Sequence, residues 1–160
     1  MGLFDSRVKK SGQKIREYLS SYDCPLSGLR FSVTQERDYC AFTCDELRGV
    51  FLNGFGGDYE SSIAIYFSEG RGLTAEVYIS NAKARGIGSS LQRVVNDAIW
   101  EYTHSSLTDT PMSANFTPYS PGDTSMTFEV CAHNYKDPME FDASLARICL
   151  IIKSVAEHFA

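Results

Sequence analysis

The C-terminal segment of the chain carries an apolar face that is too broad for a solvent-exposed helix. Apolar residues recur there at helical spacing, at Leu145, Ile148, Cys149, Ile152, Val155 and Phe159. Asp142 is a suitable cap, and the pattern predicts a closing helix over Ser144 to Phe159. A face of this width must be buried against a sheet or a partner.

The centre of the chain has the composition of strands. Apolar, β-rich runs separated by turn residues predict strands at 29–33, 39–43, 50–52, 63–67 and 73–79. Glu69 to Gly72 joins the last two runs and is the clearest hairpin turn. Two shorter strands are predicted near Met112 to Phe116 and from Met126 to Val130.

Helical spacing returns in two other places. One helix is predicted to begin after Asp5 and Ser6 and to end near Ser20, and another to cover Ser90 to Tyr102. The order is therefore helix, several strands, helix, two strands, helix. We expect one α+β domain over residues 1–160, with an antiparallel sheet flanked by helices.

The charge balance excludes some classes of protein. The chain has 15 basic and 20 acidic side chains and a net charge of −5, whereas binding to a phosphate backbone needs a basic surface, so no nucleic-acid partner is expected. Its longest apolar runs, such as Ile148 to Ile152, are far shorter than the roughly 20 residues that cross a bilayer. No secretory leader is recognisable at the start.

Cysteine usage indicates the compartment. The five cysteines are odd in number and stand in apolar contexts, where a thiol serves as a small hydrophobe: Cys24, Cys40, Cys44, Cys131 and Cys149. We interpret Cys131 as a core residue. The pattern favours a reducing compartment, and we expect a cytoplasmic protein.

The first twenty residues are basic, in contrast to the acidic remainder. They hold five basic side chains, Arg7, Lys9, Lys10, Lys14 and Arg16, against Asp5 and Glu17. We interpret this segment as a surface helix attracted to the acidic face of its own domain, with contact to a membrane or an acidic partner as the alternative. The opening Met1 to Ser6 fits the N-myristoylation pattern, so membrane contact is expected only if Gly2 is acylated.

The segment Arg85-Gly86-Ile87-Gly88-Ser89-Ser90 follows a strand and opens a helix, where free N–H groups and the helix dipole can receive a pyrophosphate. It resembles the acyl-CoA-binding segment of GNAT-type N-acetyltransferases, because Gly86 and Gly88 match the glycine positions of that family. Lys83 occupies the first position, where the family has Gln or Arg, and the chain ends in a helix where those enzymes end in strands.

That resemblance implies an acetyl-CoA site at Arg85, Gly86, Gly88 and Ser89. The competing interpretation, which we favour, is that the glycines permit a tight strand-to-helix connection capped by Ser89 or Ser90.

Other chemistry is weakly indicated, and no catalytic residue and no metal ligand is predicted. The three histidines, His104, His133 and His158, are dispersed, and Cys40 and Cys44 lack zinc-ligand spacing. A Cys131–His133 pair has no recognisable oxyanion hole, and no pair of carboxylates stands out.

Taken whole, the chain resembles the type III secretion chaperone-like superfamily, which includes the YbjN-like bacterial proteins. The segments that carry the likeness are a leading helix ending in Tyr18-Leu19, strands through Phe31, Phe42, Ile65 and Val77, the helix Ser90 to Tyr102, the strand Met126 to Cys131 and the helix Ser144 to Phe159. The resemblance implies an α-βββ-α-ββ-α order, no catalytic residues, and a dimer or small module that holds a partner polypeptide.

We therefore predict a non-catalytic protein-interaction module, acting on an unidentified protein partner and able to form a homodimer. If they are exposed, four aromatic residues are candidates for the contact surface, namely Phe51, Phe55, Tyr59 and Tyr66, although the interpretation we favour for each is a core or turn residue. Two alternatives stay open: an acyl-CoA-dependent N-acetyltransferase, and an antitoxin or immunity-type inhibitor whose acidity speeds its encounter with a basic protein.

Overall fold

A computed structural model describes residues 3–56, 60–104, 112–117, 124–132 and 138–160. The order of elements is α1 (Leu3–Leu19), β1 (Ser32–Gln35), β2 (Tyr39–Cys44), α2 (Gly49–Phe55), β3 (Ser62–Ser68), β4 (Gly72–Ile79), α3 (Leu91–His104), β5 (Met112–Phe116), β6 (Met126–Ala132) and α4 (Pro138–Phe159). The six strands form one antiparallel sheet in the order β1-β2-β3-β4-β6-β5. The predicted α+β class, an antiparallel sheet flanked by helices, is confirmed.

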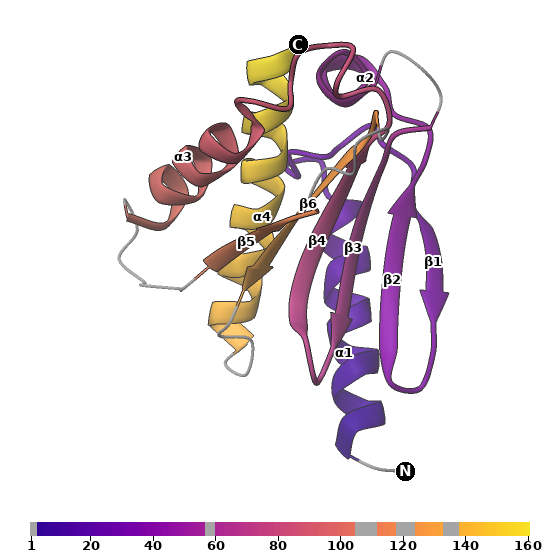
Figure 1. Ribbon diagram of the computed structural model, residues 1–160. Coiled ribbons are helices and arrows are strands. Elements are labelled where there is room, and N and C mark those ends of the chain that lie inside the picture. The colour runs from indigo at the N-terminus through magenta and orange to yellow at the C-terminus, as the bar shows by residue number, and fades with distance from the viewer. Residues whose placement is uncertain (1–2, 57–59, 105–111, 118–123, 133–137) are drawn as a thin grey trace.

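The long helices lie together on one face of this sheet (Figure 1). α1 packs on β2 and β3, α4 on β4 and β6, and α3 against α4 and β5. α2 packs on α4 near the end of the sheet. β1 and β5 are the edge strands, and Figure 1 draws no helix over the opposite face of the sheet.

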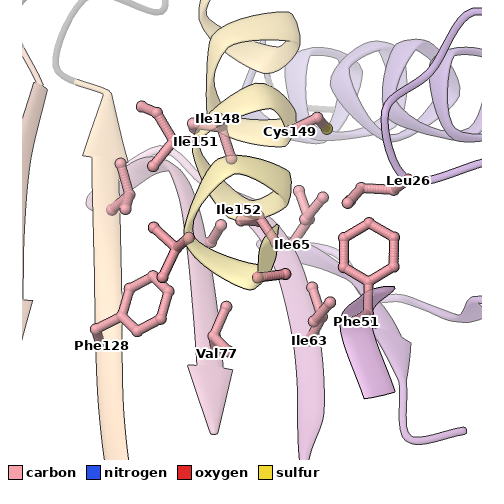
Figure 2. Packing of buried hydrophobic residues seen from close by; sticks show 14 of the residues in the cluster. Leu26, Phe51, Ile63, Ile65, Val77, Phe128, Ile148, Cys149, Ile151 and Ile152 are labelled. Atoms are coloured by element: carbon pink, nitrogen blue, oxygen red, sulfur yellow. The ribbon is translucent and has the colours of Figure 1, made fainter. Parts of the chain in front are cut away.

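The core lies between the sheet and α4, as the apolar face of the closing segment predicts. Ile148, Ile151 and Ile152 are fully buried and meet Ile65 and Phe128 of the strands (Figure 2). In β3 and β6 every second residue is buried, so the remaining residues of these strands face the side away from the helices.

The predicted strand at Val50 to Leu52 is wrong, because these residues lie in α2. Phe51 and Phe55 are four residues apart, so one side of a two-turn helix buries both rings. A three-residue apolar run fits a strand or a buried helical turn equally well, and packing on α4 decides the outcome here.

The closing helix also begins earlier than predicted, at Pro138 instead of Ser144. Proline suits the first turn of a helix, because its fixed φ is helical and its missing N–H would have no partner there.

Candidate functional site

The glycine-containing segment that resembles an acyl-CoA loop forms a tight turn before α3. Gly86 has a φ of +70°, a conformation that favours glycine. Its N–H donates to Lys83 O at 3.1 Å, and the N–H of Ile87 donates to Ala82 O at 3.0 Å. These backbone donors are therefore used inside the turn, while Ser89 is exposed and Gly88 half-buried beside them.

The side chain of Arg85 hydrogen-bonds to backbone carbonyls. Its guanidinium donates to Gly54 O at 2.7 Å, to Asn53 O and to Phe159 O at 3.3 Å. These carbonyls belong to the C-terminal ends of α2 and α4, where helix dipoles place partial negative charge. The side chain thus joins two helix ends.

The sheet face away from the helices carries a polar network across β3, β4 and β6. Tyr66 Oη donates to Glu129 Oε1 at 3.0 Å, and Arg71 Nη2 contacts both carboxylate oxygens of Glu129 at 3.0 and 3.2 Å. The Arg71 guanidinium lies 5.1 Å from the centre of the Tyr66 ring. Glu76 is the direct cross-strand partner of Glu129, so the register brings two carboxyl groups together.

Burial is the largest cause that raises the pKa of Glu76, and its neighbour Glu129 raises it further through its charge and a hydrogen bond. Burial and the hydrogen bond to Glu129 also raise the pKa of Tyr66. This carboxyl pair was not predicted, because its members are far apart in sequence and meet only through the strand register.

We expect Glu76→Gln to stabilise the protein at neutral pH. An acid whose folded pKa lies above its ordinary value of 4.5 binds protons more tightly in the folded state, so its contribution to stability falls as the pH rises through this interval. The glutamine amide carries no charge, so it removes the cost of ionising Glu76 beside Glu129, and it keeps the size and shape of the side chain. Urea unfolding across the acidic to neutral range measures it: the two proteins should converge in acid, and the variant should be the more stable at neutral pH.

Glu36→Gln, in the exposed turn between β1 and β2, is the control for the loss of one carboxylate and should leave the stability at neutral pH close to that of the parent. A Glu76→Gln variant that is less stable than the parent at neutral pH would show that Glu76 is a favourable anion, contrary to this account.

Cys131 also lies on this polar face. It is half-buried, and Thr74 Oγ1 donates to its Sγ at 3.6 Å. The prediction that Cys131 belongs to the core is therefore wrong. The two residues beside it in β6 that face the helices, Val130 and Ala132, are buried in its place.

The edge of the sheet at β1 is exposed and borders a groove. All four residues of β1 are exposed, and the groove has a volume of about 420 Å³. Its lining comes from α1, the segment before β1, and the β1–β2 hairpin, namely Arg16, Leu19, Ser20, Leu29, Arg30, Phe31, Val33 and Phe42. Arg16 and Arg30 are exposed, and within the part of the chain that the structure describes neither forms an ion pair.

The predicted aromatic candidates contribute little to this surface. Phe51 and Phe55 are buried, Tyr66 lies in the polar network, and Tyr59 lies outside the described residues. The large apolar residues that are exposed are Tyr22, Val33, Tyr39, Leu52, Trp100 and Met139. The alternation at 29–33 was the sequence signal that placed Val33 in a strand. No feature of the sequence indicated that Arg16 and Arg30 would line the same groove.

The basic first helix is held by the rest of the domain, as its interpretation requires. Arg7 pairs with Glu69 at 3.3 Å and Lys14 with Asp142 at 3.2 Å. Gly2 and His133 lie outside the described residues. None of the described helices is both long enough and apolar enough to span a bilayer.

Comparison of the chain with protein-family models, with curated proteins and with solved structures finds no match. The resemblance to the secretion-chaperone-like superfamily therefore stays a prediction. The β1 edge with its groove is the described surface that combines free strand backbone, apolar side chains and exposed arginines.

Proposed function

We propose that this protein is a non-catalytic, chaperone-like interaction module that holds an extended segment of a partner polypeptide along β1. The observation that carries the proposal is an exposed edge strand lying beside an apolar groove with a basic rim. Edge strands bind extended peptides through main-chain hydrogen bonds, while neighbouring pockets select alternate side chains.

The register of the hairpin identifies the backbone groups available for such binding. Glu36 N donates to Tyr39 O at 2.9 Å, so residues 36 and 39 form a hydrogen-bonded pair. Antiparallel pairs alternate between bonded and non-bonded. Gln35 and Val33 are therefore non-bonded opposite Cys40 and Phe42, and their N–H and C=O groups point outward from the sheet. An added strand can pair with these groups without disturbing β2.

The groove indicates the side chains that such a strand would carry. Phe31 and Val33 are incompletely buried, and the exposed arginines Arg16 and Arg30 stand at the same groove. A strand laid along β1 sends every second side chain to the helix side of the sheet. Apolar side chains there would cover Phe31 and Val33, and carboxylates in the same segment would face the arginines. The proposed ligand is therefore an extended segment that combines apolar and acidic residues.

The alternatives receive less support from this surface. A basic partner, as an antitoxin or immunity-type inhibitor would have, meets like charge at Arg16 and Arg30. A second copy of the chain, paired along β1, would give the homodimer. The cytoplasmic location remains part of this proposal, and the five free cysteines are consistent with it.

We expect the purified protein to bind short synthetic peptides of alternating valine and glutamate more tightly than matched peptides of valine and lysine. Val33→Pro should weaken binding at least about tenfold, because proline lacks the outward N–H yet is tolerated on an edge strand. Val33→Thr, which keeps the N–H and the branched shape, is the matched control. Fluorescence anisotropy measures the affinities, and sedimentation velocity reports self-association.

The double variant Arg16→Glu with Arg30→Glu tests the contribution of charge and should reverse the preference between the two peptides. Equal binding of both peptides by the parent, or undiminished binding by a folded Val33→Pro protein, would overturn the proposal. A parent dimer that Val33→Pro converts to a monomer would assign the edge to a second copy of the chain.

A further inference from the structure

The groove beside β1 adjoins a second groove, the α2 groove, which is lined by the turn after α1, the start of α2 and one side of α4. The α2 groove has a volume of about 320 Å³, and Leu29 lines both grooves. β1 begins at Ser32, three residues after Leu29, and three residues of chain span at most about 11 Å. Figure 1 shows α2 at the end of the sheet where β1 begins. A segment laid along β1 therefore reaches the α2 groove within a few residues.

The walls of the α2 groove are apolar and leave its centre open. The apolar lining comes from four residues, Pro25, Leu29, Val50 and Phe51. Gly28 and Gly49 also line the groove, and a methyl group on either glycine would meet no described atom within 4 Å. The groove thus has room for an apolar side chain of a ligand.

Basic side chains stand at the α2 groove, as they do at the groove beside β1. They are Arg48 and Lys153, and among the residues that the structure describes no acidic side chain lines either groove. Arg48 pairs with Glu46 and Lys153 with Glu157, each at 4.0 Å, and all four side chains are at least 44% exposed. Exposed ion pairs of this kind are weak, so a carboxylate of a ligand can replace either partner. In a chain with a net charge of −5, two adjoining basic grooves favour one acidic partner.

We propose that both grooves bind one partner segment, which pairs with β1 as a strand and places a second anchor in the α2 groove. The second anchor combines an apolar side chain against Phe51 with a carboxylate that faces Arg48 and Lys153. This inference rests on the proposed function of β1 and adds the length and the second contact of its ligand.

The short length of β1 is the reason that a second anchor matters. The strand has four residues, of which Val33 and Gln35 direct their N–H and C=O groups outward. Few main-chain hydrogen bonds are therefore available to a ligand, and each contributes little once its cost in desolvation is included. Once the strand has paired, the second contact forms within one complex, so it raises the affinity through a high effective concentration.

The place of the second anchor along the ligand follows from the direction of β1. The α2 groove lies beyond the Ser32 end of the strand. A ligand strand antiparallel to β1 has its C-terminal side there, and a parallel one has its N-terminal side there. An extended chain rises about 3.3 Å per residue, so a spacer of about three residues covers the distance from Ser32 to Leu29.

The test compares peptides on the full chain by fluorescence anisotropy. The base peptide alternates valine and glutamate, and two longer forms add a three-residue glycine–serine spacer and then leucine–glutamate, one form at each end. Matched controls end in glycine–serine instead of leucine–glutamate. One of the two longer peptides should bind at least about tenfold more tightly than its control. Arg48→Glu with Lys153→Glu should remove this gain.

Arg93→Glu with Lys83→Glu is the matched control variant. It makes the same change in net charge at exposed residues that line neither groove, so the gain should persist. Photocrosslinking on the unchanged protein gives a second readout that does not depend on the folding of any variant. A benzoylphenylalanine in place of the anchor leucine should link to residues 25–29 or 48–51.

The outcomes separate the second anchor from the function of β1. If the base peptide binds and neither extension adds affinity, the second anchor is wrong and the proposed function stands. A gain that persists in the Arg48→Glu, Lys153→Glu protein, or crosslinks confined to other segments, would also overturn the second anchor. A parent protein that binds none of the peptides would reject both proposals.

Discussion

Gly54→Ala is expected to lower the free energy of unfolding by about 3 kcal/mol. A methyl group built on Gly54 would lie 2.2 Å from Ala156 O and 2.7 Å from Ala156 Cα, and both atoms belong to the backbone of α4. Rigid backbone cannot give way as a side chain can, so α2 must move away from α4. In an unhindered helix the same change would stabilise by about 1 kcal/mol, so the predicted sign is opposite to that of helix propensity.

Gly12→Ala is the matched helical control. A methyl group there would lie 2.6 Å from Gln35 Oε1, the flexible end of an exposed side chain, and 3.3 Å from Cys40 Sγ. Reorientation of Gln35 relieves most of the contact, so this variant should differ from the parent by less than about 1 kcal/mol. Equilibrium urea unfolding of both variants measures the difference. Equal losses would contradict the argument that the α2–α4 approach sets the cost.

Periodicity along the chain was enough to predict the long elements. The apolar face of 145–159 predicted a helix packed on a sheet or a partner, and the buried half of the sheet follows the alternation in 63–67 and 73–79. Each of these signals is local, since one turn or one pair of residues reveals the period. Local periodicity did not predict α2 as a helix. Its conformation depends on the fit of Gly54 against Ala156, a contact between residues far apart in sequence.

The functional groups were harder to predict for the same reason. Glu76 and Glu129 form a pair only because β4 and β6 are neighbours with one particular register. Arg85 was singled out only as part of a possible cofactor loop, and its contacts with two helix ends have no local signature in the sequence.

Arg85→Met is expected to lower the free energy of unfolding by about 2 kcal/mol. Methionine keeps most of the aliphatic stem and removes the donors to Asn53 O, Gly54 O and Phe159 O. Carbonyls at two helix ends would then lose a cationic partner at a place where the dipoles of α2 and α4 repel each other. Arg85→Lys keeps the charge but cannot bridge the carbonyls as a planar fork, so it should recover only part of the loss.

Adding millimolar acetyl-CoA to the unfolding measurements distinguishes the two interpretations of the segment Arg85 to Ser90, a structural turn or a cofactor site. If Arg85 serves the helix ends, the ligand leaves the midpoint of the parent unchanged, and Arg85→Met loses stability by the same amount with or without it. If the segment is a cofactor site, acetyl-CoA raises the parent's midpoint by mass action, and Arg85→Met or Arg85→Lys reduces that rise. Since the guanidinium already contacts three backbone carbonyls, binding a pyrophosphate would require it to leave them. We therefore expect the midpoint to stay unchanged.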